Sequence, residues 1–382
     1  MIKPIKTKKM KKQLYIISIF TAFLFTLNSC KKDTLPGESF SYEEVLKSGG
    51  EFDEFNNQKI LVNVSTTSIP VDSGNWNCVN NTWNVTQGDL DFPLYDPNVS
   101  VVYPGSLLQG SSLNNATPDV IAVKRGKGTV SIDIVNGSGA VYVNVNEVKK
   151  SHIAQALNDI INDNNKVMPA RFTFEHEEVK TKEELSLSLG LNAEIVPVTA
   201  ASSLSFSNED ETNHYLVVLK QSFYTMSYDI PYNYADFFDT SVKPMDLVKY
   251  VYRGNPACYV SDVTYGRVFY LLIESTSSAV KIKAAINLSF SNAPVSGEIE
   301  TNYLSSLENL SVKVLALGGS TASTFSAISA SQLSTLTTQL AKSSDLKAGV
   351  PLSYVVRTVY NNKLVKNKID LEYTINDCQL VP

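Results

Sequence analysis

The sequence holds few of the side chains that active sites and metal centres use. It has 3 His in 382 residues, and His152, His176 and His214 show no ligand spacing among themselves or toward the cysteines. No glycine pattern matches a dinucleotide-binding or phosphate-binding loop, and there is no G-x-S-x-G. The acidic run from Glu175 to Glu184 could bind a cation, but such runs are more often solvated surface. We therefore expect a protein that is not an enzyme and has no metal or cofactor.

Net charge and cysteine are also scarce. The 33 Lys and Arg against 38 Asp and Glu give a formal net charge of -5, and this weakly acidic balance argues against nucleic acid as a partner. There are 4 Cys. With Cys30 set aside, Cys78, Cys258 and Cys378 are an odd number, so at most one disulfide forms and at least one thiol is free.

The N-terminus has the layout of an export signal. Residues 1–13 carry several Lys, Leu14–Leu27 is short and mostly apolar, and Leu27-Asn28-Ser29-Cys30 follows. This is typical of a secretory signal peptide rather than a spanning helix. Small residues before Cys30 resemble the lipobox of bacterial lipoproteins, which implies cleavage after residues 1–29 and a diacylglyceryl group on the thiol. An ordinary signal with a nearby cysteine is the alternative. We expect an exported protein, lipid-anchored at a bacterial outer membrane or cell surface.

The rest of the chain reads as strands and a few helices. A capping box at Ser41–Glu44 predicts a short helix, and the apolar spacing from Ile153 to Ile161 predicts another. Lys59–Trp83, Leu216–Tyr228 and Tyr259–Ser275 are rich in β-branched and aromatic residues and predict strands. The mixture indicates an α+β protein with a large sheet.

Two runs alternate apolar and polar residues for an unusual length, Leu185–Ile195 and Val280–Phe290. A strand buried on one face of an ordinary sheet also alternates, but such strands are typically about 5–6 residues long. A tilted membrane-crossing strand needs about 9–11 residues, and both runs reach that length. The apolar members are Leu185, Leu187, Leu189, Leu191 and Ile195 in the first run and Val280, Ile282, Ala284, Ile286, Leu288 and Phe290 in the second.

Several segments resemble the cholesterol-dependent, or thiol-activated, cytolysins. The most specific is Tyr259–Tyr270, which contains Val263-Thr264-Tyr265-Gly266-Arg267 and continues to Ser278. The resemblance runs discontinuously from about Tyr103 to Tyr373. The other segments that carry it are Tyr103-Pro104-Gly105, Lys220–Ser227, Phe238–Val242 and Val314–Gly319.

The resemblance implies a fold and a domain plan. It implies a bent antiparallel central sheet, flanked by helical clusters that can refold to β-hairpins, and an elongated β-rich domain. The implied hairpin segments, about Lys182–Asn208 and Val280–Tyr303, contain both alternating runs, so we expect these runs to be largely helical in the water-soluble monomer. The implied boundaries are 30–46 for a tether and the start of domain 1; 83–180, 216–275 and 349–367 for domain 1; 47–82 and 368–382 for the elongated domain 2; and 181–215 and 276–348 for domain 3.

The resemblance also implies roles for single residues. The apolar members of both runs would face lipid, and Ser186, Ser188, Asn192, Lys281, Lys283, Asn287 and Ser289 would face water. Gly318 and Gly319 match a glycine pair that the family uses as a hinge, although a lone Gly-Gly is more often a turn. An aromatic pair that joins neighbouring subunits in the family is altered, with Phe174 at one position and Val312 at the other. A neighbouring acid–Lys contact has His176 and Ala330 in its place.

The chain stops at Pro382, about where the C-terminal membrane-binding sandwich of the family would begin, so we expect no such sandwich. In this it resembles short cytolysin-like proteins of Bacteroidetes that are thought to act with a longer partner. The leading hypothesis is a pore-forming subunit that assembles with itself into a ring on a lipid bilayer, together with a longer family member. The alternative is a surface lipoprotein on the same scaffold that binds or inhibits, protects its own cell, and never inserts.

Overall fold

The computed structural model describes residues 40–71, 74–96, 100–115, 117–133, 139–164, 167–168, 172–191, 212–296, 299–318, 326–328, 333 and 344–381. Met1–Phe40 forms one unit and Ser41–Pro382 a second, compact one, which holds all the described helices and strands. The expected signal peptide, Cys30, Asn192, Ile195, Gly319 and Ala330 lie outside the described residues. None of the helices in the described ranges is long and apolar enough to cross a membrane.

A large antiparallel sheet is built around two long strands, β9 (Asn213–Tyr228) and β10 (Ala257–Ser275). Within the described residues it has 11 strands. Strand β10 is buried along almost its whole length, because the sheet is covered on both faces, and its sequence is accordingly mostly apolar and aromatic. Both strands were predicted from the sequence, and the predicted fold class, α+β, is confirmed.

The partner of β10 changes along its length. On the side away from β9, it pairs first with β14 (Val350–Thr358) and then with β11 (Ser311–Leu317). On the other side, Ala257–Tyr259 pair with β4 (Leu107–Gln109) before the pairing with β9 begins. The register shifts at Tyr265/Gly266, next to the point where β14 ends and β11 takes over. This change of partner divides the sheet into an upper and a lower half.

Four strands in spatial order form the lower half: β8 (Thr173–Glu178), β9, β10 and β11. Every neighbouring pair is antiparallel. A short strand, β12 (Ser326–Ile328), pairs with Val312–Val314 of β11. In the described part of the chain, β8 and β12 are therefore the outer strands of this half.

A separate three-stranded sheet, here called the long sheet, contains β1 (Gln58–Val71), β2 (Gly74–Asp89) and β16 (Asn367–Val381). Cys78 and Cys378 lie opposite each other on β2 and β16 and form a disulfide. Cys258 is a free, buried thiol on β10. The prediction of at most one disulfide and at least one free thiol is confirmed.

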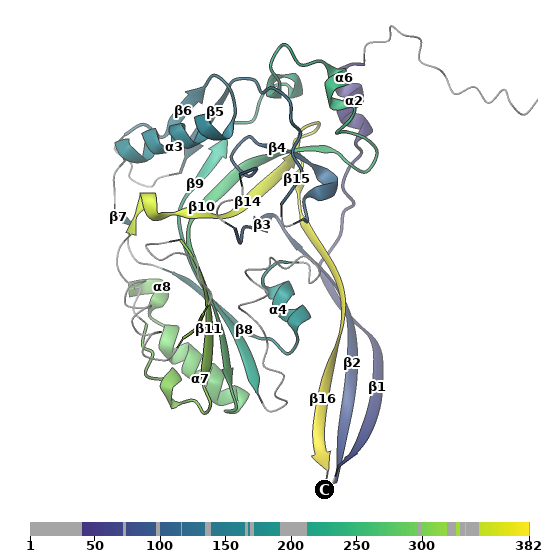
Figure 1. Ribbon diagram of the computed structural model, residues 1–382, viewed down its shortest axis with the longest axis vertical. Coiled ribbons are helices and arrows are strands. Elements are labelled where there is room, and N and C mark those ends of the chain that lie inside the picture. The colour runs from purple at the N-terminus through teal and green to yellow at the C-terminus, as the bar shows by residue number, and fades with distance from the viewer. Residues whose placement is uncertain are drawn as a thin grey trace, which may run out of the picture. The chain divides into compact units, whose positions relative to one another are not determined.

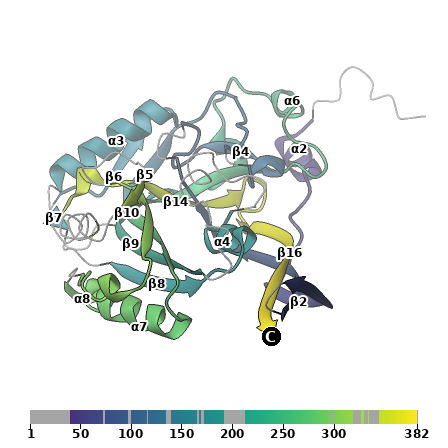
Figure 2. The ribbon, with the colours of Figure 1, turned by 60° about the horizontal axis from the view of Figure 1, so that its bottom comes forward.

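The remaining elements cover or extend these sheets (Figures 1 and 2). The predicted capping box is present, with the Ser41 hydroxyl accepting from the Glu44 amide at the start of α2. The predicted helix around Ile153–Ile161 is α3. The helices are α2 (Tyr42–Ser48), α3 (Lys150–Asp163), α4 (Lys182–Ser188), α6 (Pro244–Leu247), α7 (Ala279–Phe290) and α8 (Ala293–Ser296), and the other strands are β3 (Asp91–Pro93), β5 (Gly128–Ile132), β6 (Tyr142–Val145), β7 (Val167–Met168), β13 (Ser344–Asp345) and β15 (Leu364–Val365).

Candidate functional site

Helices α4 and α7 cover opposite faces of the lower half of the central sheet (Figure 2). Side chains alternate across a strand, so neighbouring residues of β9 and β10 fall into two separate apolar clusters. The α7 face carries Tyr215, Val217, Leu219, Phe269, Leu271 and Ile273. The α4 face carries Leu216, Val268, Leu272, Leu315 and Leu317.

Helix α7 is the second alternating run in helical form, as expected for the soluble monomer. Ile282, Ile286 and Phe290 are fully buried against the sheet, at the four-residue spacing of one helix face. Val280 is 81% exposed and Leu288 53% exposed, and Ala284 is exposed as well. The helix therefore buries only half of a set of residues that a strand would place on a single face.

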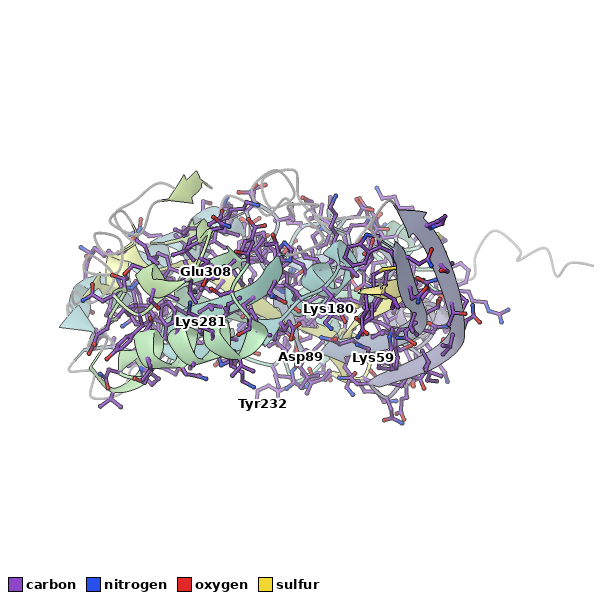
Figure 3. The ribbon with its side chains drawn as sticks, turned by 90° about the horizontal axis from the view of Figure 1, so that it is seen from below. Lys59, Asp89, Lys180, Tyr232, Lys281 and Glu308 are labelled. Atoms are coloured by element: carbon purple, nitrogen blue, oxygen red, sulfur yellow. A yellow bond between two sulfur atoms is a disulfide. The ribbon has the colours of Figure 1, made fainter. Side chains whose placement is uncertain are left out.

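The polar side chains of α7 are unevenly satisfied. Ser289 is buried, and its hydroxyl has no hydrogen-bond partner in the described part of the chain. Asn287 Oδ1 lies 3.0 Å from His176 Nε2 on β8, and Lys281 Nζ lies 3.3 Å from Glu308 Oε1 (Figure 3). Leaving a buried hydroxyl without a partner costs about 1–3 kcal/mol, so the helical state of α7 is not optimal.

Helix α4 contains the start of the first alternating run. Leu185 and Leu187 in the helix and Leu189 directly after it are buried. Leu185 and Leu189 pack on the α4 face of the central sheet, whereas Leu187 packs against Val85 and Ile369 of the long sheet. Because α4 has a sheet on each side, opposite faces of one helix can both be apolar. Leu191 is half-buried beside the same cluster.

Polar contacts, three of them from the long sheet, hold α4 at its two ends. At its start, Glu184 Oε1 accepts from Lys59 Nζ at 3.2 Å and from the Tyr373 hydroxyl at 3.0 Å. Past its end, Asn367 Nδ2 donates to the Gly190 carbonyl at 3.1 Å. The Tyr95 hydroxyl donates to the Leu189 carbonyl.

The pKa values of Lys59 and Tyr373 are shifted where the long sheet contacts α4. Burial lowers the pKa of Lys59, but hydrogen bonds to Tyr373 and Glu184 outweigh it and leave the pKa above its ordinary value. Burial is also the main cause that raises the pKa of Tyr373. Lys59 therefore remains charged and the Tyr373 hydroxyl remains protonated near neutral pH, so both act as donors to Glu184.

Gly318 lies where β11 ends, next to the change of partner on β10. It adopts φ +81°, which favours glycine, and a Cβ there would lie 2.6 Å from the Gly266 carbonyl oxygen. The chain then returns so that β12 covers three residues of β11. The geometry at Gly318 supports a turn that only glycine fits, and a hinge there remains a prediction.

The residues expected at a subunit interface lie on the two sides of the lower half. Phe174 and His176 are on β8, where the Phe174 ring lies 5.5 Å from that of Phe290 on α7. Val312 is buried on β11, where it pairs with Ile328 of β12. All three belong to the α7 face, and one subunit does not bring Phe174 and Val312 together. Their role between subunits stays a prediction.

The residues around α4 include functional candidates that the sequence did not single out. Glu184 was seen only as part of an acidic run, and nothing indicated its partners Lys59 and Tyr373, which are distant in sequence. Over the described ranges, no group of three or more His, Cys, Asp or Glu side chains is placed to hold a metal ion.

Comparison with known proteins gives a family. Residues 77–377 match the thiol-activated cytolysin family. The chain belongs to this family, whose members are pore-forming toxins. Streptolysin O of Streptococcus pyogenes serotype M6 is 29% identical over 249 residues, which are 63% of this chain and 43% of that protein. Ivanolysin of Listeria ivanovii is 27% identical over 304 residues, 76% of this chain and 57% of that protein. The cytolysin chain thus spans about half the length of these relatives.

Solved structures of cytolysins share the fold. Listeriolysin O superposes with a TM-score of 0.71 at 22% identity, covering 88% of this chain and 73% of that chain. The human-specific toxin intermedilysin superposes with a TM-score of 0.67 at 22% identity, covering 89% and 76%. The family membership expected from the Tyr259–Tyr270 segment is confirmed.

Proposed function

We propose that this chain is a pore-forming subunit whose α4 and α7 segments refold into two transmembrane β-hairpins. The topology of the lower half supports this. The α4 segment connects β8 to β9, and the α7 segment connects β10 to β11, and both of these pairs are antiparallel neighbours. If each segment became a hairpin, it would lengthen the two strands that it connects, and the four strands would continue as one sheet.

The observation that carries the proposal is the phase of the alternation. On β10, the even-numbered residues such as Leu272 lie on the α4 face, so an unbroken continuation places Val280, Ile282, Ala284, Ile286, Leu288 and Phe290 on that face. On β8, Glu175 and Glu177 lie opposite Val218 and Leu216 and so share the α4 face. Continuing β8 therefore places its odd-numbered leucines on that face too. Both apolar sets fall on one side of one sheet, as a barrel wall in lipid needs.

The return strand of the second hairpin follows the same rule. Glu274 pairs with Ser311, and the same register continued downward sets Ile282 opposite Tyr303, Ile286 opposite Ile299 and Phe290 opposite Val295. In the helical state Val295 is 76% exposed and Tyr303 40% exposed. Extension would thus move exposed apolar side chains from both strands onto the lipid-facing side.

Assembly would use the outer strands of the lower half. Release of β12 at a Gly318–Gly319 hinge would uncover the edge of β11, and an uncovered edge is a template for another strand. With four alternating strands in each subunit, a copy rotated about a ring axis presents a β8 that is antiparallel to β11. All strands can then pair in a closed barrel, which is what the membrane interior requires.

The proposal includes export, a lipid anchor at Cys30 and assembly with a longer family member. An anchor would hold the chain at a surface and raise its local concentration there. Assembly with a longer family member is part of the proposal, and the leakage assay below tests the chain with and without one.

The test uses two arginine variants that fall on opposite faces of the extended strand, of which Asn287→Arg also removes the exposed contact with His176. Ala284 and Asn287 are both exposed on α7, so Ala284→Arg and Asn287→Arg should leave the monomer folded. In the extended state only position 284 faces lipid, where an arginine costs about 2–4 kcal/mol at the membrane midplane. We expect Ala284→Arg to reduce dye leakage from vesicles at least about tenfold, and Asn287→Arg to reduce it by less than about threefold.

The leakage assay would use the mature chain, alone and with a longer family member, on vesicles of phosphatidylcholine, phosphatidylethanolamine and cholesterol. Thermal unfolding of each variant controls for folding. Equal leakage from both variants would contradict hairpin insertion. Leakage that persists when engineered disulfides tie α4 and α7 to the sheet would contradict it as well.

The competing function is a capping or protective protein that never inserts. It is favoured by the present state of the two outer strands, since β12 covers β11 while β8 has no second strand partner among the described residues. A chain that kept β12 in place could join a growing ring through β8 and stop it. Proteolysis showing that Leu185–Leu189 and Ile282–Phe290 stay water-shielded in the assembled complex would favour this function.

A further inference from the structure

One row of side chains crosses all four strands of the lower half on the α4 face. Glu177 of β8 pairs with Leu216 of β9, Leu216 with Leu272 of β10, and Leu272 with Lys313 of β11. Residues that pair directly across antiparallel strands share a face. The row therefore starts with an acid on one outer side of the four strands and ends with a base on the other.

The acidic end of the row is available. Glu175 lies two residues from Glu177 on the same face, and both side chains are exposed and line a cavity of about 930 Å³. Neither carboxylate makes an ion pair within the described part of the chain. Strand β8 therefore offers two carboxylates beside an edge that a neighbouring strand could join.

At the basic end of the row, Lys313 is positioned by an ion pair with the buried Glu274. Lys313 Nζ lies 2.8 Å from Glu274 Oε1, and the two side chains are 15% and 5% exposed. His214 Nε2 lies 3.5 Å from the same Glu274 oxygen. An ammonium has three donors, so Lys313 can keep Glu274 and also donate to a carboxylate across the β11 edge.

We propose that Lys313 of one subunit pairs with Glu175 or Glu177 of the next, and that this contact selects a second copy of the chain as neighbour. The inference rests on the proposed assembly through β8 and β11. In a continued sheet, Lys313 and the two glutamates fall on the same face, the α4 face. Strands in a closed barrel are staggered relative to one another, so Lys313 need not lie directly opposite Glu177. Because Glu175 lies two residues away on the same face, Lys313 can pair with Glu177 without a stagger or with Glu175 when the strands are shifted by two residues.

The opposite face offers no such charge pair. There, β8 presents Phe174, His176 and Glu178, whereas β11 presents only the apolar Val312, Val314 and Ala316 within the described residues, so Glu178 has no base on β11 to face. Apolar and aromatic contacts on that face add area, but complementary charges are what suppress a wrong partner or register. The charge pair on the α4 face therefore sets the specificity of the junction.

A pair of charge-reversed variants tests this directly. Lys313→Glu makes the β11 end acidic and leaves the two glutamates of β8 unchanged. Glu175→Lys/Glu177→Lys makes the β8 end basic and leaves Lys313 of β11 unchanged. Each variant alone places like charges at every junction, so we expect at least about a tenfold loss of ring assembly. An equimolar mixture restores opposite charges at every junction if the two alternate, and it should recover assembly to within about twofold of wild type.

Two readouts separate this inference from the proposed function: subunit association by energy transfer between labelled chains, and insertion by dye leakage, both on vesicles of phosphatidylcholine, phosphatidylethanolamine and cholesterol. Thermal unfolding of Lys313→Glu and of Lys313→Gln controls for the effect on Glu274, and recovery in the mixture also excludes misfolding. Association that follows the charge pattern without leakage would support the junction and contradict the pore. Unchanged association in the variants, a mixture that does not recover, or a wild type that never associates would overturn the junction.

Discussion

The two segments that connect the strands of the lower half are held in the soluble state by different forces. Helix α4 lies between two sheets, its two leucines and Leu189 directly after it are buried, and Glu184 is anchored by Lys59 and Tyr373. Helix α7 lies on one sheet, buries one apolar stripe and leaves Val280 and Leu288 in solvent. Even their buried serines differ, because the Ser186 hydroxyl donates to the Lys182 carbonyl while the Ser289 hydroxyl has no partner in the described structure.

This difference predicts different sensitivities. The position of α4 depends on the long sheet, so changes in β1, β2 or β16 should reach it. The position of α7 depends on apolar packing against β9, β10 and β11, so only changes in that packing should reach it. Release of the two segments can therefore be separated experimentally.

The largest effect is expected from removing the Cys78–Cys378 disulfide. Its cysteines are 300 residues apart in sequence, and closing so long a loop stabilises a fold by about 2–5 kcal/mol. Cys78→Ser/Cys378→Ser should lower the free energy of unfolding by that amount and increase hydrogen exchange in Leu185–Leu189 more than in Ile282–Phe290. Reductant should reproduce the effect on the wild type and leave the variant unchanged. Equal increases in hydrogen exchange in both segments would contradict the conclusion that only α4 depends on the long sheet.

A cavity under α7 should give the next largest effect. Ile286 is fully buried and Leu288 is 53% exposed on the same helix. Replacing a buried isoleucine by alanine costs about 2–5 kcal/mol, so Ile286→Ala should lower stability in urea unfolding by about 2–4 kcal/mol and loosen α7 alone. The matched variant Leu288→Ala should change stability by less than about 0.5 kcal/mol. A large loss in Leu288→Ala would show that this side chain is not solvent-exposed.

Features of the fold that depend on neighbouring residues in the sequence could be predicted, whereas contacts between distant segments could not. The strands β9 and β10, helix α3 and the capping box at Ser41 are local patterns, and they were predicted. The alternation at Val280–Phe290 by itself predicts a strand, and only the family resemblance indicated the helix that the structure contains.

What could not be predicted depends on register. Cys78 faces Cys378, and Glu177 shares a row with Lys313, only because distant strands pair at one particular offset. A shift of one residue would move any of these strand side chains to the other face. Glu184 contacts Lys59 only because helix α4 packs on the long sheet. Local sequence patterns do not specify such offsets.

A smaller effect is expected at the contact between α4 and the long sheet. Glu184→Gln removes the charge that Lys59 and Tyr373 share, and because Lys59 is 46% exposed the loss should be about 1 kcal/mol. Glu183→Gln is the control, since it occupies the same first helical turn and loses only the favourable interaction with the helix dipole. The difference between the two variants should shrink in high salt.

The pH dependence of this contact has a definite sign. The folded-state pKa of Lys59 is raised above its ordinary 10.5, so its stabilisation is complete below that value and is lost only as pH rises through the higher folded-state pKa. The contact should therefore not change near neutral pH. A Glu184→Gln effect that disappears between mildly acidic and neutral pH would contradict the assignment of Lys59 as the partner.

The smallest expected effect runs in the opposite direction. Ser289→Ala removes a buried hydroxyl without a partner and improves helix propensity by about 0.5 kcal/mol, so the monomer should gain about 0.5–1 kcal/mol. Ser186→Ala should gain less, because the Ser186 hydroxyl already has a partner. In the proposed hairpin, position 289 would face water, where serine costs nothing. A more stable α7 should then slow leakage about two- to fivefold with no change in the final extent. Leakage that is faster in Ser289→Ala would mean that α7 is not the segment whose release limits insertion.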